Sequence, residues 1–182
     1  MEHKIILVDG YCATGKSTFS NKLAEELKIP CFNKDTLKEV LGQGFGPESG
    51  EVYQKGSAVT FLLLLHIAER FLQAGRICIL ESNFRPGELE QIRELLEKYH
   101  GQCLTFLFKG DLDVLFERYL ARDRSGKRHW VHKSAGADKE AFQKGQLHLG
   151  TVSIGQTVHV DATSFDDVNY EELFDEARTF AG

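Results

Sequence analysis

Hydrophobic and polar positions alternate along the chain in blocks that predict strands separated by helices. Short apolar runs of the kind found in the buried strands of parallel sheets occur at residues 4–8, 30–33, 76–80, 103–108 and 158–160. Helical periodicity lies between these runs, at residues 17–27, 36–41, 51–74, 86–99, 111–122 and 170–180. This order predicts a three-layer α/β fold with a five-stranded parallel sheet, in which residues 1–182 form a single domain.

Two glycine-containing segments interrupt the pattern and are expected to be loops. The first covers residues 42–50 and contains Pro47. With the long helix that follows it, this loop is expected to shape a substrate pocket. The second loop covers residues 124–137 and is basic, and a short helix is expected after it.

The most specific motif follows the first predicted strand and opens the first predicted helix. Residues 10–17 read Gly-Tyr-Cys-Ala-Thr-Gly-Lys-Ser and match the pattern G-x-x-x-x-G-K-[ST] in full. Gly10 and Gly15 let the backbone wrap closely around a phosphate. Lys16 is expected to reach the β- and γ-phosphates, and the Ser17 hydroxyl is expected to be a ligand of Mg²⁺. The motif predicts a P-loop NTPase fold.

The nucleotide is expected to be ATP, bound together with Mg²⁺. A GTPase of the usual kind would carry Asn-Lys-x-Asp near the fourth strand, and the sequence has no such motif there. The residues expected to contact the nucleotide through the P-loop are Gly10, Cys12, Ala13, Thr14, Gly15, Lys16, Ser17 and Thr18.

Composition and charge narrow the possible partners. The formal net charge of −5 argues against binding to long nucleic acids, because such proteins usually carry a basic face. The most apolar stretch, residues 58–65, is followed by His66, Glu69 and Arg70. A membrane-spanning helix needs about 20 apolar residues, so a soluble, cytoplasmic protein without a signal peptide is expected. The four scattered cysteines lack zinc-site spacing and are expected to be reduced core thiols.

Beyond the P-loop, residues 31–38, 77–86 and 115–122 resemble those of P-loop kinases that phosphorylate a hydroxyl. This group includes polynucleotide 5′-kinase, zeta toxin and chloramphenicol phosphotransferase. The resemblance implies an ATP-dependent phosphotransferase that acts on a hydroxyl of a small molecule, nucleoside or nucleotide. It also implies that Asp35 is the general base that accepts the proton of that hydroxyl. The alternative role for Asp35 is to cap the helix expected from Thr36, and the two roles are compatible.

The same resemblance suggests substrate-binding residues near Asp35. Polynucleotide kinases carry an arginine three residues after the base, where this chain has Lys38. A lysine lacks the bidentate fork of arginine, which argues against a polynucleotide acceptor. Glu81 ends the third predicted strand and is expected to position substrate or a Mg²⁺-bound water, or else to bond nearby backbone. Asn83 and Arg85 are further candidate substrate contacts.

Residues 117–133 reverse the acidic balance of the chain. Six basic residues stand against two acidic ones, which gives this segment a net charge of +4. Arg118 and Arg122 lie four residues apart, on one side of a helix, and resemble the lid entry of nucleoside monophosphate kinases. That resemblance implies that Arg118 packs on adenine and that Arg122 and Arg124 meet the phosphates, with a helical lid at residues 122–137. A solvated helix end is the alternative. His129 and His132 make a weak case for a metal site.

Three functions remain open on these grounds. The first is the kinase, and the second is an ATP-hydrolysing or regulatory protein. The usual acidic Walker-B pair is missing, since the third predicted strand ends only in Leu80-Glu81-Ser82. The third is a binding module without catalysis, which the presence of Lys16 and Asp35 argues against. The sequence does not name the phosphoryl acceptor.

Overall fold

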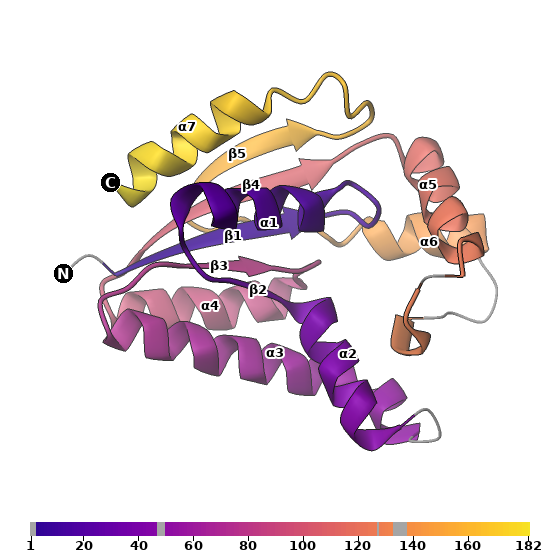
Figure 1. The fold of residues 1–182 in the computed structure, drawn as a ribbon, viewed down its shortest axis with the longest axis horizontal. Helices are drawn as coiled ribbons and strands as arrows, with labels where there is room; N and C mark the ends of the chain where they lie inside the picture. Colours follow the sequence, from indigo (N-terminus) through magenta and orange to yellow (C-terminus); the bar gives the residue numbers. More distant parts are fainter. Residues whose placement is uncertain (1–2, 47–49, 127, 133–137) are drawn as a thin grey trace.

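The structure is a computed structural model that describes residues 3–46, 50–126, 128–132 and 138–182, with only the backbone described for residues 50–54. Its described residues form a sheet of five parallel strands in the order β2-β3-β1-β4-β5 (Figure 1), which confirms the predicted fold class. The strands are β1 (Lys4–Gly10), β2 (Cys31–Asn33), β3 (Cys78–Glu81), β4 (Gln102–Lys109) and β5 (Gln156–Asp161). Leu7 at the centre of β1 is paired with Leu80 of β3 and with Thr105 of β4.

Helices cover both faces of this sheet. One face carries α1 (Lys16–Leu27) and α7 (Tyr170–Ala181), and the other carries α3 (Gly50–Gln73) and α4 (Pro86–Lys98) (Figure 1). Successive side chains of a strand point to opposite faces. Ile6 and Val8 therefore pack with Phe19 of α1 in one apolar core, while Ile5 and Leu7 pack with the helices of the other face. Burial of β1 between two apolar layers anchors the loop that follows it.

The remaining elements stand at the carboxyl ends of the strands. They are α2 (Lys34–Phe45), α5 (Leu112–Arg124), the short 3₁₀ helix η1 (Trp130–His132) and α6 (Lys139–Gln146). In Figure 1, α5 and α6 lie beyond the arrowheads of the central strands, and α2 extends away from β2. Ligands of open parallel sheets bind at this edge, so the fold gathers the candidate residues there.

The end of α2 corrects one prediction. Residues 42–45 belong to this helix, although the sequence favoured a loop from residue 42. Two glycines in the last turn weaken the helical signal, because each costs about 1 kcal/mol relative to alanine. Every other predicted boundary lies within two residues of the observed one.

Two further predictions concern the membrane and the cysteines. No helix in the described part of the chain is long and apolar enough to cross a membrane. All four cysteines are free, and only Cys78 and Cys103 are fully buried in the core. Cys12 and Cys31 are partly buried, and Cys12 belongs to the P-loop.

Candidate active site

The P-loop adopts a strained backbone that its glycines permit. Gly10, Ala13 and Gly15 all have positive φ angles, of 128°, 62° and 82°. A Cβ atom on Gly10 would lie 1.9 Å from the carbonyl oxygen of Phe108 in β4. The amide of Tyr11 donates to the same oxygen at 2.9 Å. The first motif glycine is therefore required by the close approach of β4 as well as by its φ angle.

The Lys16 side chain is directed into the loop. Its ammonium donates to the carbonyl oxygens of Gly10, at 3.3 Å, and of Tyr11, and it lies 3.5 Å from Oγ1 of Thr14. The residue is only 5% exposed. A buried cation surrounded by backbone dipoles is a fixed positive charge in the middle of an anion-binding loop.

Three polar side chains meet at the start of α1. The Ser17 hydroxyl donates to Glu81 Oε2 at 3.1 Å and accepts from Asn33 Nδ2 at 3.3 Å. Burial raises the pKa of the Glu81 carboxyl to about 7, and the Lys16 ammonium opposes the shift. A hydroxyl and a carboxylate are oxygen ligands of the type that Mg²⁺ prefers, with phosphates and waters completing its octahedron. These residues therefore fit the expected metal.

Asp35 and the helix cap are different residues. Asn33 is the N-cap of α2, and its side-chain oxygen accepts from the amide of Thr36 at 3.0 Å. Asp35 is the second residue of the helix and is exposed. The capping role considered for Asp35 is thus filled by Asn33, and the Asp35 carboxylate faces the cavities described next.

Two cavities of about 390 and 480 Å³ adjoin at the carboxyl edge of the sheet. The smaller, which we name the P-loop cavity, is lined by residues 12–18 and by Asp35, Glu81, Asn83, Arg118, Ala121, Arg122, Arg128 and Phe165. The larger, which we name the side cavity, is lined by Cys12, Lys34, Asp35, Lys38, Ser57, Ser82, Asn83, Arg85, Arg128, Val131, His132, Gly145, Gln146, His148 and Leu149. They share four residues, Cys12, Asp35, Asn83 and Arg128. Asp35 therefore lies at their junction.

The predicted site residues divide between these cavities. Lys38 and Arg85 line only the side cavity, whereas Glu81 lines only the P-loop cavity. Asn83 lines both, and its Nδ2 donates to the Gly10 carbonyl at 2.8 Å. Arg124 lines neither of them.

The arginines of α5 and the adjoining loop have distinct environments. Arg118 donates to the carbonyls of Ala162, at 2.5 Å, and Thr163, at 2.7 Å, and stacks 3.8 Å from the ring centre of Phe165. Arg122 is exposed at the P-loop cavity. Arg128 lines both cavities and pairs with Asp123 at 3.0 Å.

Sequence reasoning did not single out Arg128 or Phe165 as site residues. The net charge of the lid segment indicated that a basic side chain would face the phosphates. It did not indicate which of the six basic residues of that segment this would be. Phe165 follows β5, and one of its ring atoms lies 3.1 Å from where a Cβ of Gly15 would be. In the sequence, Phe165 is a single aromatic residue in a polar loop, and no pattern around it distinguishes a site residue from a core residue.

Residues 128–132 of the predicted lid pack on α2. Val131 is 2% exposed, and a Cβ on Gly42 would lie 2.5 Å from its Cγ1. His132 Nε2 lies 3.1 Å from Oε1 of Glu39, and burial lowers the pKa of His132. No group of three potential metal-ligating side chains occurs among the described residues, so nothing adds a third ligand to His129 and His132. Residues 127 and 133–137 of the predicted lid lie outside the described chain.

Gly42→Ala should loosen the lid from α2. The new methyl group would contact the buried, β-branched side chain of Val131, which has little freedom to move. Hydrogen exchange of residues 128–132 should become faster. Gly44→Ala is the matched control in the same helical turn, because no described atom outside the adjoining backbone and side chains of its own helix lies within 4 Å of its Cβ position. It should stabilise α2 by up to about 1 kcal/mol without changing that exchange; equal exchange in both variants would contradict the packing role of Gly42.

Comparison with known proteins places this geometry in a wider group. The described fold is similar to a protein from Chloroflexus aurantiacus that is provisionally assigned as a kinase, with a TM-score of 0.85 and 31% identity over 97% of both chains. A gluconokinase from Sinorhizobium meliloti shares the fold at a TM-score of 0.57 and 21% identity, over 96% of this chain and 89% of the other. The Mycobacterium tuberculosis APS kinase CysC, in complex with AMPPNP and APS, also shares the fold. Its TM-score is 0.61 and its identity 16%, over 97% of this chain and 95% of the other.

No curated protein matches the chain. A family model does: residues 5–146, from β1 to the end of α6, match an AAA domain. The matched range includes the P-loop, the base candidate and the lid arginines. The chain therefore belongs to this AAA domain family of P-loop proteins, and its fold is one that kinases share.

Proposed function

We propose that the protein transfers the γ-phosphoryl group of ATP to a hydroxyl group of a small molecule or nucleotide. One observation carries this proposal. Asp35 lines both the P-loop cavity and the side cavity, which is of comparable size. A phosphotransferase needs a proton acceptor between the γ-phosphate and the acceptor hydroxyl, and an enzyme that only hydrolyses ATP needs no second cavity.

The chain's own side chains supply the steps. Asp35 takes the proton of the acceptor hydroxyl while the oxygen of that hydroxyl forms a bond to the γ-phosphorus. The bond from that phosphorus to the bridging oxygen breaks, and ADP leaves. Lys16, Arg122 and Arg128 offset the charge that the phosphoryl oxygens carry during transfer. When bound through Ser17 and Glu81, Mg²⁺ would add further charge neutralisation.

The nucleotide base is expected to lie near Arg118. The Arg118 guanidinium donates to two backbone carbonyls and stacks on Phe165. Planar guanidinium groups favour such stacking on aromatic rings. We assign adenine to this end of the P-loop cavity. Arg124 faces neither cavity, so Arg128 takes its place in the transfer step.

A screen of acceptors tests the proposal. Without an acceptor, ADP formation from Mg·ATP should be slow. It should become faster with one class of acceptor in a screen of sugars, sugar acids, nucleosides, nucleotides, hydroxylated antibiotics and oligonucleotides. Mass spectrometry should then identify the phosphorylated product. Oligonucleotides are not expected to be accepted, given the net charge of −5 and Lys38 at the position of the polynucleotide-kinase arginine. ADP formation that no acceptor stimulates would instead support a hydrolase.

A further inference from the structure

The side cavity carries an excess of positive charge. Its lining includes four cationic side chains, Lys34, Lys38, Arg85 and Arg128, and two histidines, His132 and His148. Asp35 is its one acidic side chain among the described residues. One carboxylate can offset only one of these four positive charges. This imbalance distinguishes the cavity from a site shaped for a neutral acceptor.

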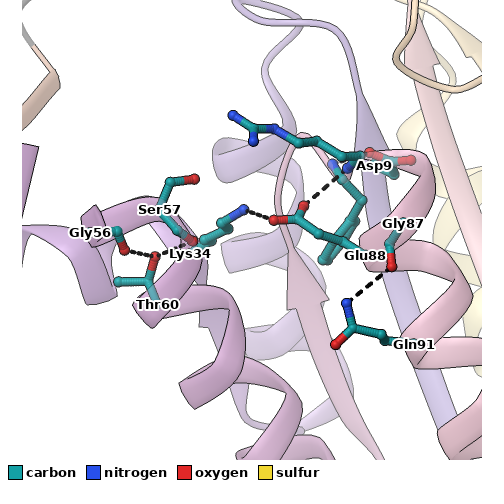
Figure 2. A network of polar contacts seen from close by, with 10 residues as sticks. Asp9, Lys34, Gly56, Ser57, Thr60, Gly87, Glu88 and Gln91 are labelled. Atoms are coloured by element: carbon teal, nitrogen blue, oxygen red, sulfur yellow. Dashed lines mark hydrogen bonds and ion pairs between the residues drawn. The ribbon is translucent and has the colours of Figure 1, made fainter. Parts of the chain in front are cut away.

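Two of these cations are already paired. Lys34 forms a salt bridge of 2.5 Å with Glu88 of α4, with both side chains largely buried (Figure 2). Lys34 is the first residue of α2, and Glu88 lies in the first turn of α4. Figure 2 shows the Lys34 ammonium directed at the Glu88 carboxylate. Arg128 pairs with Asp123 at 3.0 Å. Each of these two side chains therefore already has one anionic partner.

Lys38 and Arg85 are the remaining cations. Within the described chain neither side chain forms an ion pair. They reach the cavity from different elements, Lys38 from α2 and Arg85 from the residue that precedes α4. Burial lowers the pKa of Lys38, the Asp35 carboxylate opposes this shift, and the charges of Lys34 and Arg128 add to it. An anion bound beside Lys38 would further favour its charged form.

The spacing of Lys38 and Asp35 allows a small anion to reach both residues. The two residues are three positions apart on α2, so they project from the same side of the helix with Cβ atoms about 5–6 Å apart. A molecule that places a hydroxyl at Asp35 therefore needs its negative group only a few bonds away to reach Lys38.

We propose that the phosphoryl acceptor is a small hydroxylated anion, whose carboxylate or phosphate is bound by Lys38 and Arg85 while its hydroxyl lies at Asp35. This inference rests on the proposed kinase function and names its substrate class. Carboxylates and phosphates share the oxygen geometry that a lysine and an arginine bind. The cavity charge does not choose between them, and the experiment below does.

Matched acceptors provide the first test. Glycerol, glycerate and glycerol 3-phosphate form one series, sorbitol and gluconate a second, and adenosine and adenosine 3′-phosphate a third. Within the series that is used, the anionic member should exceed the neutral one in kcat/KM by about 10–100-fold, as expected for hydrogen bonds to charged groups. The comparison of glycerate with glycerol 3-phosphate identifies the preferred anion. Equal use of neutral and anionic members would overturn the inference but leave the kinase intact.

Variants locate the effect. Lys38→Met and Arg85→Met should each raise KM for the anionic acceptor about 10–100-fold, with KM for ATP unchanged. Lys144→Met is the charge-matched control, because Lys144 is exposed on α6 and lines neither cavity. An unchanged acceptor KM in both Lys38→Met and Arg85→Met would contradict the assignment. A rise in KM for ATP of the same size would also contradict it.

Binding of inorganic phosphate gives a readout that does not require turnover. With the P-loop saturated by Mg·AMPPNP, phosphate should raise the melting temperature of the wild type and of Lys144→Met in a saturable way, and should not raise that of a Lys38→Met/Arg85→Met double variant. No saturable effect in the wild type would overturn the inference. Phosphate binding at these residues, combined with no stimulation of ADP formation by any acceptor, would instead overturn the kinase function.

Discussion

Asp35→Asn should lower the rate of phosphoryl transfer by about 10²–10⁴-fold, the usual contribution of a general base. Asparagine retains the shape of the side chain and removes the basic carboxylate. The fold should be unaffected, because Asp35 is exposed and the cap of α2 is Asn33. ATP affinity should also be retained. Single-turnover kinetics with the identified acceptor, together with calorimetric titration of an ATP analogue, measure the two quantities separately.

The matched control is Glu25→Gln, which removes an exposed carboxylate of α1 that lines neither cavity. Its turnover should equal that of the wild type. Turnover of Asp35→Asn within a few-fold of the wild type would show that Asp35 is not the base. Glu81 would then be the next candidate, because it is the other carboxylate that lines the P-loop cavity.

Lys16→Met should abolish most of the catalytic activity, with a loss of several kcal/mol of transition-state stabilisation, corresponding to about 10²–10³-fold or more in kcat/KM. The Lys16 ammonium is buried among the carbonyls of the loop, so its charge acts there with little screening by water. Methionine is preferred to alanine in this variant because it fills the space of the lysine stem. The affinity for ATP, measured by calorimetry, should fall as well.

Lys22→Met controls for the loss of a positive charge from the same helix, since Lys22 is exposed and lines neither cavity. Circular dichroism melting should show that both variants are folded. If Lys16→Met binds ATP with unaltered affinity and remains active, the assignment of the P-loop as the nucleotide site fails.

The sequence alone determined the framework of the protein. Short apolar runs that alternate with helical periodicity are typical of a parallel sheet covered by helices, so the layer order and the five strands followed from the pattern. The P-loop was equally decided, because each fixed position of the motif has a local cause: glycine at positive φ, lysine in the loop, serine at the start of α1. These causes act over a few residues and are therefore readable along the chain, whereas the close approach of β4 to Gly10 is seen only in the structure.

Contacts between distant segments decided the rest. Gly42 stays helical and fits Val131, which is 89 positions later, and only their packing explains that choice. Which lid arginine reaches the cavities depends on the path of η1, and that path depends on α2. The structure was also needed to show that Asn33 caps α2 and that Asp35 does not, because this depends on where α2 begins. Local propensity is a weak signal at helix ends, and the free energy of packing overrides it there.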